Sequence, residues 1–366
     1  MDGLDRNRRR SSWYLPLLAA TAALCVSIAA SVPPHHQTEQ PSTTLINSSG
    51  AIALNPQTGK VYAVATRSSA VSVFNPRTKS TSSVPVGEGP VALALNPATN
   101  RIYVANTEGG SLSVIDGATD TVLATLSVGR LPYVLAVNPV TNKIYVSNTF
   151  SDVITVIDGA TNSITTVKAG SADAIAVDAE LDKVYLLGYE NANLTVLDGV
   201  PSIVGKIPVG MHPWGMAVNQ STGTLYVTRS GNSELGVVNE VSGRVTMVPT
   251  GAIPCAVEVN PVTNRIYVAN HGDDTVTVID GTKREVIATV KVGQRPQGIA
   301  VDPKTNRVYI ANTHSDTVTV IDGAQNKVLK TLTSKKNPYA LAVDTKSGQL
   351  FVASYGEPAL AVVDPR

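Results

Sequence analysis

The sequence predicts an all-β protein, a closed β-propeller of eight four-stranded blades. One short phrase recurs eight times, the copies are 40 to 42 residues apart, and each copy is made of short runs with strand character. A fixed period of this length built from short strands is typical of a propeller array. The residue that opens each copy is Asn55, Asn96, Asn138, Asp178, Asn219, Asn260, Asp302 or Asp344.

Each copy divides into four expected strands, which in the second copy span 91–95, 101–105, 112–115 and 122–128. An Asn-Pro-x-Thr-Asn loop joins the first two, and its Pro presets φ for a tight turn. Its last position always holds Asn, Asp or Gly, which tolerate the left-handed region, so we expect a positive φ there. The eight residues at this position are Gly59, Asn100, Asn142, Asp182, Gly223, Asn264, Asn306 and Gly348.

The first strand of each copy alternates small and large residues, as Ala92 and Ala94 do with Leu93 and Leu95. Successive strand residues face opposite sides, so a flat face of one blade should meet a bulky face of its neighbour near the axis. The second strand carries an aromatic residue that we expect to form a buried layer. These are Tyr62, Tyr103, Tyr145, Tyr185, Tyr226, Tyr267, Tyr309 and Phe351.

The number of blades follows from counting strands. The first three strands occur eight times, but only seven copies are followed by a fourth. Residues 42–46 have strand character and are predicted to supply the missing outer strand and close the ring. A seven-bladed ring is the alternative, and it would leave one unit unpaired.

The amino-terminal residues differ in kind from the repeats. Four Arg between Arg6 and Arg10 precede an apolar stretch over 13–30, and small residues end it at Ala29-Ala30-Ser31. This pattern predicts that residues 1–31 are a secretory signal peptide, or a signal anchor if they are not cleaved. Residues 32–41 are then a linker and 42–366 a single propeller, located in the periplasm, outside the cell or on its surface.

Composition limits the expected partners. The chain has 29 Lys and Arg against 28 Asp and Glu, so no general nucleic-acid surface is expected. Membrane contact is expected only through residues 13–30, if they are retained. Cys25 lies in the predicted signal and leaves Cys255 alone, so the propeller has no intramolecular disulfide. The propeller is expected to be a monomer.

The repeats resemble the YVTN β-propeller repeat family. Its Tyr-Val-x-Asn phrase stands at 103–106, 145–148 and 267–270, and its Val-Ile-Asp-Gly phrase at 114–117 and equivalent positions. The resemblance covers about residue 42 to the carboxy terminus. It implies an exported or surface-located propeller, and it transfers no catalytic residue.

Candidate binding residues are those that depart from the repeat in the loops of one ring face, because the other copies show that the blade does not need them. Seven lie before or at the start of first strands: Glu88, Arg130, Tyr133, His212, Trp214, Arg295 and Tyr339. The eighth, Glu258, replaces the Ala that the other copies carry near the axis. A carboxylate there requires water, a partner or a ligand.

Neither a metal nor a cofactor is predicted. His271 and His314 lie in loops of adjacent copies with carboxylates nearby, but they are one residue out of register. Covalent haem would need a Cys-x-x-Cys-His motif, and the sequence has none.

These observations favour a non-catalytic binding or scaffold protein that uses one ring face or the channel mouth for a protein, a glycan or a small ligand. The alternative is a propeller hydrolase of the lactonase type acting at the same mouth, so whether the chain is an enzyme stays open.

Export can be tested directly. We expect the intact mass of the protein from the native envelope fraction to show removal of about 31 residues, because small residues there offer a cleavage site. An uncleaved mass in the membrane fraction would indicate the anchor, and a cytoplasmic location would contradict both.

Overall fold

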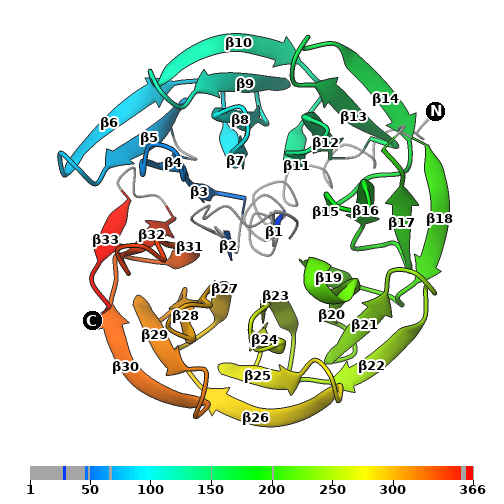
Figure 1. Ribbon diagram of the computed structural model, residues 1–366, viewed down its shortest axis with the longest axis vertical. Helices are drawn as coiled ribbons and strands as arrows, with labels where there is room; N and C mark the ends of the chain where they lie inside the picture. Colours follow the sequence, from blue (N-terminus) through cyan, green and yellow to red (C-terminus); the bar gives the residue numbers. More distant parts are fainter. Residues whose placement is uncertain are drawn as a thin grey trace, which may run out of the picture.

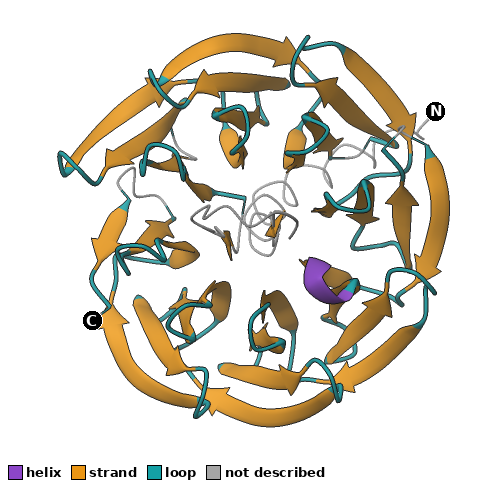
Figure 2. Ribbon diagram, viewed as in Figure 1, coloured by secondary structure: helices purple, strands orange, loops and turns teal. Residues whose placement is uncertain are grey.

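The computed structural model describes residues 28–29, 46–47, 50–65, 68–149, 151–199, 202–355 and 360–365. Eight antiparallel sheets stand around one axis, each with its repeat strands ordered from the axis outward (Figures 1 and 2). The predicted eight-bladed propeller is therefore confirmed. One short helix, η1 (Gln220–Thr222), occurs in the described residues. No described helix is long and apolar enough to cross a membrane.

The strands of blades 1 to 4 follow one another in chain order. Blade 1 comprises β3 (Ile52–Leu54), β4 (Val61–Ala65), β5 (Ala70–Asn75) and β6 (Ser80–Pro85). Blade 2 comprises β7 (Pro90–Asn96), β8 (Arg101–Asn106), β9 (Ser111–Asp116) and β10 (Thr121–Ser127). Blade 3 comprises β11 (Pro132–Asn138), β12 (Lys143–Asn148), β13 (Val153–Asp158) and β14 (Ile164–Lys168). Blade 4 comprises β15 (Ala174–Asp178), β16 (Lys183–Leu187), β17 (Asn193–Leu197) and β18 (Ile203–Pro208).

Blades 5 to 8 continue the same order. Blade 5 comprises β19 (Pro213–Asn219), β20 (Thr224–Arg229), β21 (Glu234–Asn239) and β22 (Val245–Pro249). Blade 6 comprises β23 (Pro254–Asn260), β24 (Arg265–Asn270), β25 (Thr275–Asp280) and β26 (Glu285–Lys291). Blade 7 comprises β27 (Pro296–Asp302), β28 (Arg307–Asn312), β29 (Thr317–Asp322) and β30 (Lys327–Thr333). Blade 8 contains β31 (Pro338–Val343), β32 (Leu350–Ser354) and β33 (Ala361–Val363).

The eighth sheet corrects one prediction. Two short amino-terminal strands, β1 (Ile28–Ala29) and β2 (Ile46–Asn47), extend it in the order β1-β2-β31-β32-β33. Asn47 pairs with Ala342, so β2 joins the inner edge, whereas residues 42–46 were predicted to complete the outer edge beside β33. Strand character alone does not say which of two sheet edges a segment joins, since both present unpaired backbone groups. Residues 42–45 lie outside the described residues.

Side-chain packing joins the last blade to the first. The rings of Phe74 on β5 and Phe351 on β32 have centroids 5.9 Å apart. Ile52, Tyr62 and Ala342 are fully buried in one hydrophobic cluster that includes Phe351. Burial of apolar surface between these two blades therefore holds the ring closed.

The two repeated features expected from the sequence are present. All eight aromatic residues of the second strands are at most 1 % exposed, which confirms the buried layer. Burial is the main reason that the pKa values of the tyrosine hydroxyls in this layer lie above the ordinary value of 10. The last residue of the loop between the first two strands has φ between 49° and 74° in all eight blades, as predicted.

A side-chain hydrogen bond crosses five of the eight blade interfaces. The Asn that opens one blade donates its amide to the side-chain oxygen of the positive-φ Asn or Asp in the next blade. The pairs are Asn55–Asn100 at 2.6 Å, Asn96–Asn142 at 2.7 Å, Asn138–Asp182 at 2.7 Å, Asn219–Asn264 at 3.0 Å and Asn260–Asn306 at 2.8 Å. We call this contact the inter-blade clasp.

The remaining three interfaces replace the clasp in a coordinated way. Where the opening residue is Asp178, Asp302 or Asp344, the next blade around the ring has Gly at the positive-φ position. An ionised Asp has no donor, so the opening residue cannot make the hydrogen bond that an opening Asn makes in the clasp. The positive-φ residue is therefore Gly at each interface whose opening residue is Asp.

The turn between the third and fourth strands obeys a second rule. Five blades with an Asn or Asp in the clasp have Gly in this turn, and an added Cβ at Gly117 would overlap Oδ1 of Asn100. The three blades with Gly at the positive-φ position instead have a larger residue in the turn: Pro76, Glu240 and Pro365. In blades 1 and 5 this larger residue lies 3.7 Å from an added Cβ on Gly59 or Gly223, so the two positions share one space and only one of them fills it. In blade 8 nothing lies within 4 Å of an added Cβ on Gly348.

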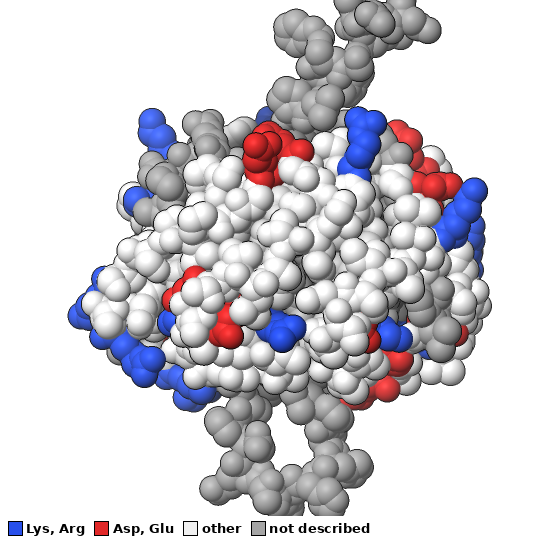
Figure 3. Space-filling model, turned by 90° about the horizontal axis from the view of Figure 1, so that it is seen from above, with Lys and Arg blue, Asp and Glu red and all other residues white. Residues whose placement is uncertain are grey.

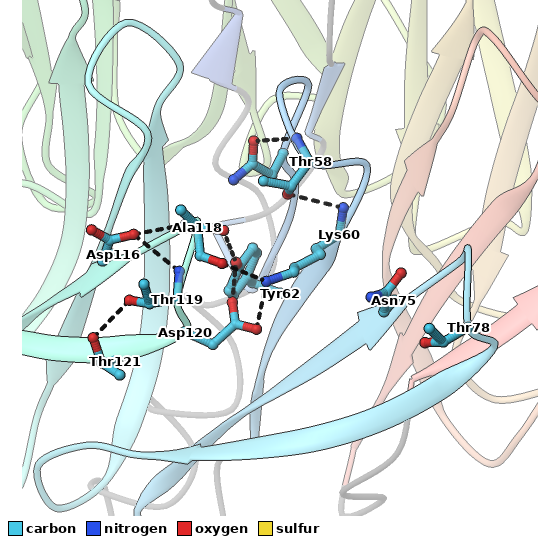
Figure 4. Close-up of polar contacts among 12 residues, drawn as sticks. Thr58, Lys60, Tyr62, Asn75, Thr78, Asp116, Ala118, Thr119, Asp120 and Thr121 are labelled. Atoms are coloured by element: carbon cyan, nitrogen blue, oxygen red, sulfur yellow. Dashed lines mark hydrogen bonds and ion pairs between the residues drawn. The ribbon is translucent and has the colours of Figure 1, made fainter.

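A basic residue at the start of the second strand reaches the same turn of the next blade. Between blades 1 and 2, Nζ of Lys60 lies 2.6 Å from Oδ2 of Asp120 and 3.2 Å from the carbonyl oxygen of Ala118 (Figure 4). The hydroxyl of Tyr62 donates to Oδ1 of Asp120 at 2.6 Å. Arg101 makes the corresponding contact between blades 2 and 3, at 2.8 Å to the carbonyl oxygen of Gly159.

The shared space can be tested with one methyl group. Gly117→Ala should lower the free energy of unfolding by about 2 kcal/mol, because its Cβ overlaps Asn100 and the facing Asn55. Gly205→Ala in the outer strand β18 is the matched control, since nothing lies within 4 Å of its added Cβ. Denaturant unfolding of both variants measures the difference. Equal stability of the two variants would contradict the shared-space rule.

Candidate functional site

The loops that precede the innermost strands and those that join the second and third strands lie together on one ring face. Their backbones are hydrogen-bonded: the N–H of Ser230 donates to the carbonyl oxygen of His212 at 3.0 Å, and that of Thr313 to Arg295 at 3.1 Å. His212 and Arg295 occupy equivalent positions with φ of 52° and 51°. Gly89 fills the same position in blade 2, which shows that the turn itself needs no side chain.

Three rings gather where blades 4 and 5 meet on this face. Tyr189 follows β16, while His212 and Trp214 flank the start of β19. The ring of Tyr189 lies edge-on to Trp214 with centroids 5.7 Å apart and contacts His212 at 5.1 Å. Tyr189 is 39 % exposed, His212 is exposed and Trp214 is half-buried. We call Tyr189, His212 and Trp214 the aromatic cluster.

A carboxyl group holds the loop that carries Tyr189. Asp173, in the position of blade 4 that Trp214 fills in blade 5, accepts a hydrogen bond from the backbone N–H of Tyr189 at 2.7 Å. Burial raises the pKa of Asp173, although the bond from Tyr189 opposes the rise. Asp173 therefore fixes the loop that carries Tyr189 and adds a polar group beside three aromatic rings.

Arg295 lies apart from the aromatic cluster, in a group between blades 6 and 7. Its Nη1 is 3.4 Å from Nε2 of His271, and its backbone N–H donates to Oδ1 of Asp274 at 2.8 Å. Burial, followed by the charge of Arg295, lowers the pKa of His271, and the nearby His314 acts in the same direction. The imidazole of His271 is thus kept neutral at neutral pH and can accept from the guanidinium.

The structure scatters the other sequence-predicted residues. Glu88 and Arg130 are exposed in the loops that enter blades 2 and 3. Tyr133 is 7 % exposed on β11, and Tyr339 is 2 % exposed and stacks on Tyr355 with centroids 4.1 Å apart. Glu258 is 1 % exposed on β23. Of the eight predicted residues, His212 and Trp214 are the pair that the described contacts bring together.

Sequence reasoning did not select Tyr189, the residue that links His212 to Trp214. Its signal was present, because blade 4 departs from the repeat at Leu186-Leu187-Gly188 directly before it. The equivalent position is Thr107 in blade 2 and Thr313 in blade 7, whose hydroxyls bond a Pro carbonyl oxygen of the next blade. Where these Thr residues make a hydrogen bond to the next blade, Tyr189 instead places its ring against His212 and Trp214 of the next blade.

Metal ligands give no second candidate site in the described part of the chain. No group of three or more His, Cys, Asp or Glu side chains there is arranged to hold a metal ion. Basic and acidic side chains are interspersed over a largely uncharged surface on the side shown in Figure 3.

The closed ring of blades defines a β-propeller protein. Residues 35–328 match the family described as "Lactonase, 7-bladed beta-propeller", and the chain belongs to this family. The match ends within β30, the outer strand of the seventh blade, so β31, β32 and β33 of the eighth blade lie beyond it. No curated protein matches the sequence.

Solved propellers resemble the chain in fold. The structure titled "Kuenenia stuttgartiensis Hydrazine Synthase" has a TM-score of 0.60 and 16 % identity, over 90 % of this chain and 97 % of that one. "Dihydro-heme d1 dehydrogenase NirN in complex with DHE" has a TM-score of 0.66 and 14 % identity, over 91 % of this chain and 77 % of that one. At these identities the likeness concerns the fold alone.

The position of His212 allows its ring to be removed without damage to the loop. His212→Gly should leave the free energy of unfolding unchanged or raise it by up to about 1 kcal/mol, because Gly adopts a positive φ without strain. Thermal and denaturant unfolding of this variant measure the effect. A loss above about 2 kcal/mol would show that the ring of His212 packs as part of the blade.

Proposed function

We propose that this chain is an exported, non-catalytic propeller with YVTN-type repeats, and that it binds a ligand at the aromatic cluster. The observation that carries the proposal is the contact of Tyr189, His212 and Trp214 across two blades, with Tyr189 39 % exposed. His212 and Trp214 stand at positions where the other blades have different residues, and the position of Tyr189 is otherwise Tyr in blade 8 alone. Exposed aromatic groups at such a junction are typical energetic anchors of binding surfaces.

The geometry favours a ligand with a flat, largely apolar ring face, such as a sugar or an aromatic ring. The edge-on arrangement of Tyr189 and Trp214 offers two surfaces at a steep angle, 81° apart. The imidazole of His212 can donate or accept a hydrogen bond at the margin. A ring that stacks on one surface would meet polar groups at its edge, which supports a small ligand or the end of a glycan.

A lactonase-type hydrolase is the second candidate function, and family membership is what favours it. An enzyme of this kind would need several polar groups aimed into the channel mouth from different blades. On the innermost strands, the buried Glu258 stands where the other blades have Ala. Hydrolysis of a lactone and ester panel by the purified full chain, abolished by Glu258→Gln, would support the enzyme.

Binding at the aromatic cluster can be tested by a fluorescence screen of sugars and aromatic acids against the full chain. For any ligand found, Trp214→Ala should weaken binding by about 2 kcal/mol or more, roughly 30-fold, because a central aromatic anchor is lost. Tyr189→Ala should weaken it as well. Tyr355→Ala is the matched control, since Tyr355 holds the same loop position in blade 8 but stacks on Tyr339. Equal affinities of all four proteins would contradict the site.

A further inference from the structure

The interface between blades 4 and 5 differs from the other seven in having two carboxyl groups in place of a clasp. Glu240 occupies the turn position that is Gly in five blades and Pro in two, and Gly223 faces it. Oε2 of Glu240 lies 3.7 Å from the position that a Cβ on Gly223 would take. The Glu240 side chain therefore fills the space that an Asn fills in the clasp.

The opening residue at this interface is Asp178, which has no amide to donate and whose charge acts on Glu240. Oδ1 of Asp178 already accepts from the backbone N–H groups of Glu180 at 2.9 Å and Leu181 at 3.0 Å. Glu240 is 5 % exposed, and neither of its carboxyl oxygens has a hydrogen-bond donor among the described residues. Two ionised carboxylates offer acceptors only, so a hydrogen bond between them requires a proton.

The groups around Glu240 determine when that proton is held. Burial, then the neighbouring carboxyl group of Asp178 and its charge, raise the pKa of Glu240 from 4.5 to about 8, while Lys183 opposes the rise. Tyr185 on β16 also lies near the pair: after burial, the charges of Glu240 and Asp178 raise the pKa of its hydroxyl. Because the pKa is higher in the folded protein, the interface is fully stabilised below about pH 4.5 and loses this stabilisation as the pH rises through about 8.

The same two blades carry the aromatic cluster. Asp178 ends β15 and Lys183 begins β16, the strand that Tyr189 follows. Glu240 follows β21, which belongs to the same sheet as β19. His212 directly precedes β19, and Trp214 is its second residue. Each blade is one hydrogen-bonded sheet, so the carboxyl pair and the aromatic cluster lie at opposite ends of the same two sheets.

We propose that Asp178 and Glu240 form a proton-dependent latch that holds blades 4 and 5 together and so regulates the aromatic cluster. The latch is closed when one proton is shared between the two carboxyl groups. It opens when both are ionised, because the like charges repel within a buried space that Lys183 neutralises in part. The regulatory role rests on the proposed binding function, whereas the latch itself does not.

The latch is tested without any ligand, in the full chain with Trp13→Phe so that Trp214 is the one Trp that emits. Between pH 5.5 and 8.5 the parent should lose about 5 °C in melting temperature. Quenching of Trp214 by acrylamide should rise about two-fold over the same range as the cluster loosens. Glu240→Gln keeps the shape, supplies a donor and needs no shared proton, so both changes should be absent in this variant.

A second variant covers the case in which Glu240→Gln folds poorly. Asp178→Asn places an amide donor against the Glu240 carboxylate, the arrangement that Asn138 and Asp182 already make between blades 3 and 4. It should likewise remove the pH dependence of melting and quenching. If the parent and both variants respond to pH alike, the latch is overturned. If they differ as expected but no ligand binds, the latch stands and the proposed binding function fails.

Discussion

The fit of neighbouring blades depends on one set of three positions, which forms a side-chain hydrogen bond at five of the eight interfaces. An opening Asn or Asp, a positive-φ residue and a turn residue occupy these positions at every interface. Where the clasp forms, its side chains leave no room for one on the turn residue. Where the opening residue is Asn, the amide of Asn96, for example, finds the oxygen of Asn142 at 2.7 Å, and the turn residue is Gly159. Where it is Asp, the acceptor disappears. This complementarity of donor, acceptor and space sets how neighbouring blades fit together.

Much of this architecture could be predicted from the sequence, because its causes are local. The positive φ of Asn100 follows from its residue type and loop position, and the burial of Tyr103 follows from strand alternation. The inner-edge position of β2 could not be predicted in this way. A segment such as 42–46 has strand character wherever it pairs, and the choice of edge depends on the three-dimensional path of the chain.

The site was predicted in part for the same reason. Comparison among repeats selected His212 and Trp214, which do lie at one junction with a common partner. It also selected Tyr339, which the fold buries against Tyr355. A departure from the repeat shows that a residue is not required by the blade, but it does not say whether the side chain points outward. Tyr189 and Glu240 were missed because each matters through a residue of the neighbouring blade.

The blade 4–5 interface thus combines two departures from the repeat, an aromatic cluster on one face and a carboxyl pair in place of a clasp. The most direct measurement of this account is a pair of high-resolution crystal structures of the chain at pH 5.5 and pH 9. The account predicts Asp178 and Glu240 oxygens about 2.6 Å apart at the lower pH, the length of a charge-assisted O–H···O bond, and their separation at the higher pH. Carboxyl oxygens that are well separated at both pH values, or equally close at both, would contradict it.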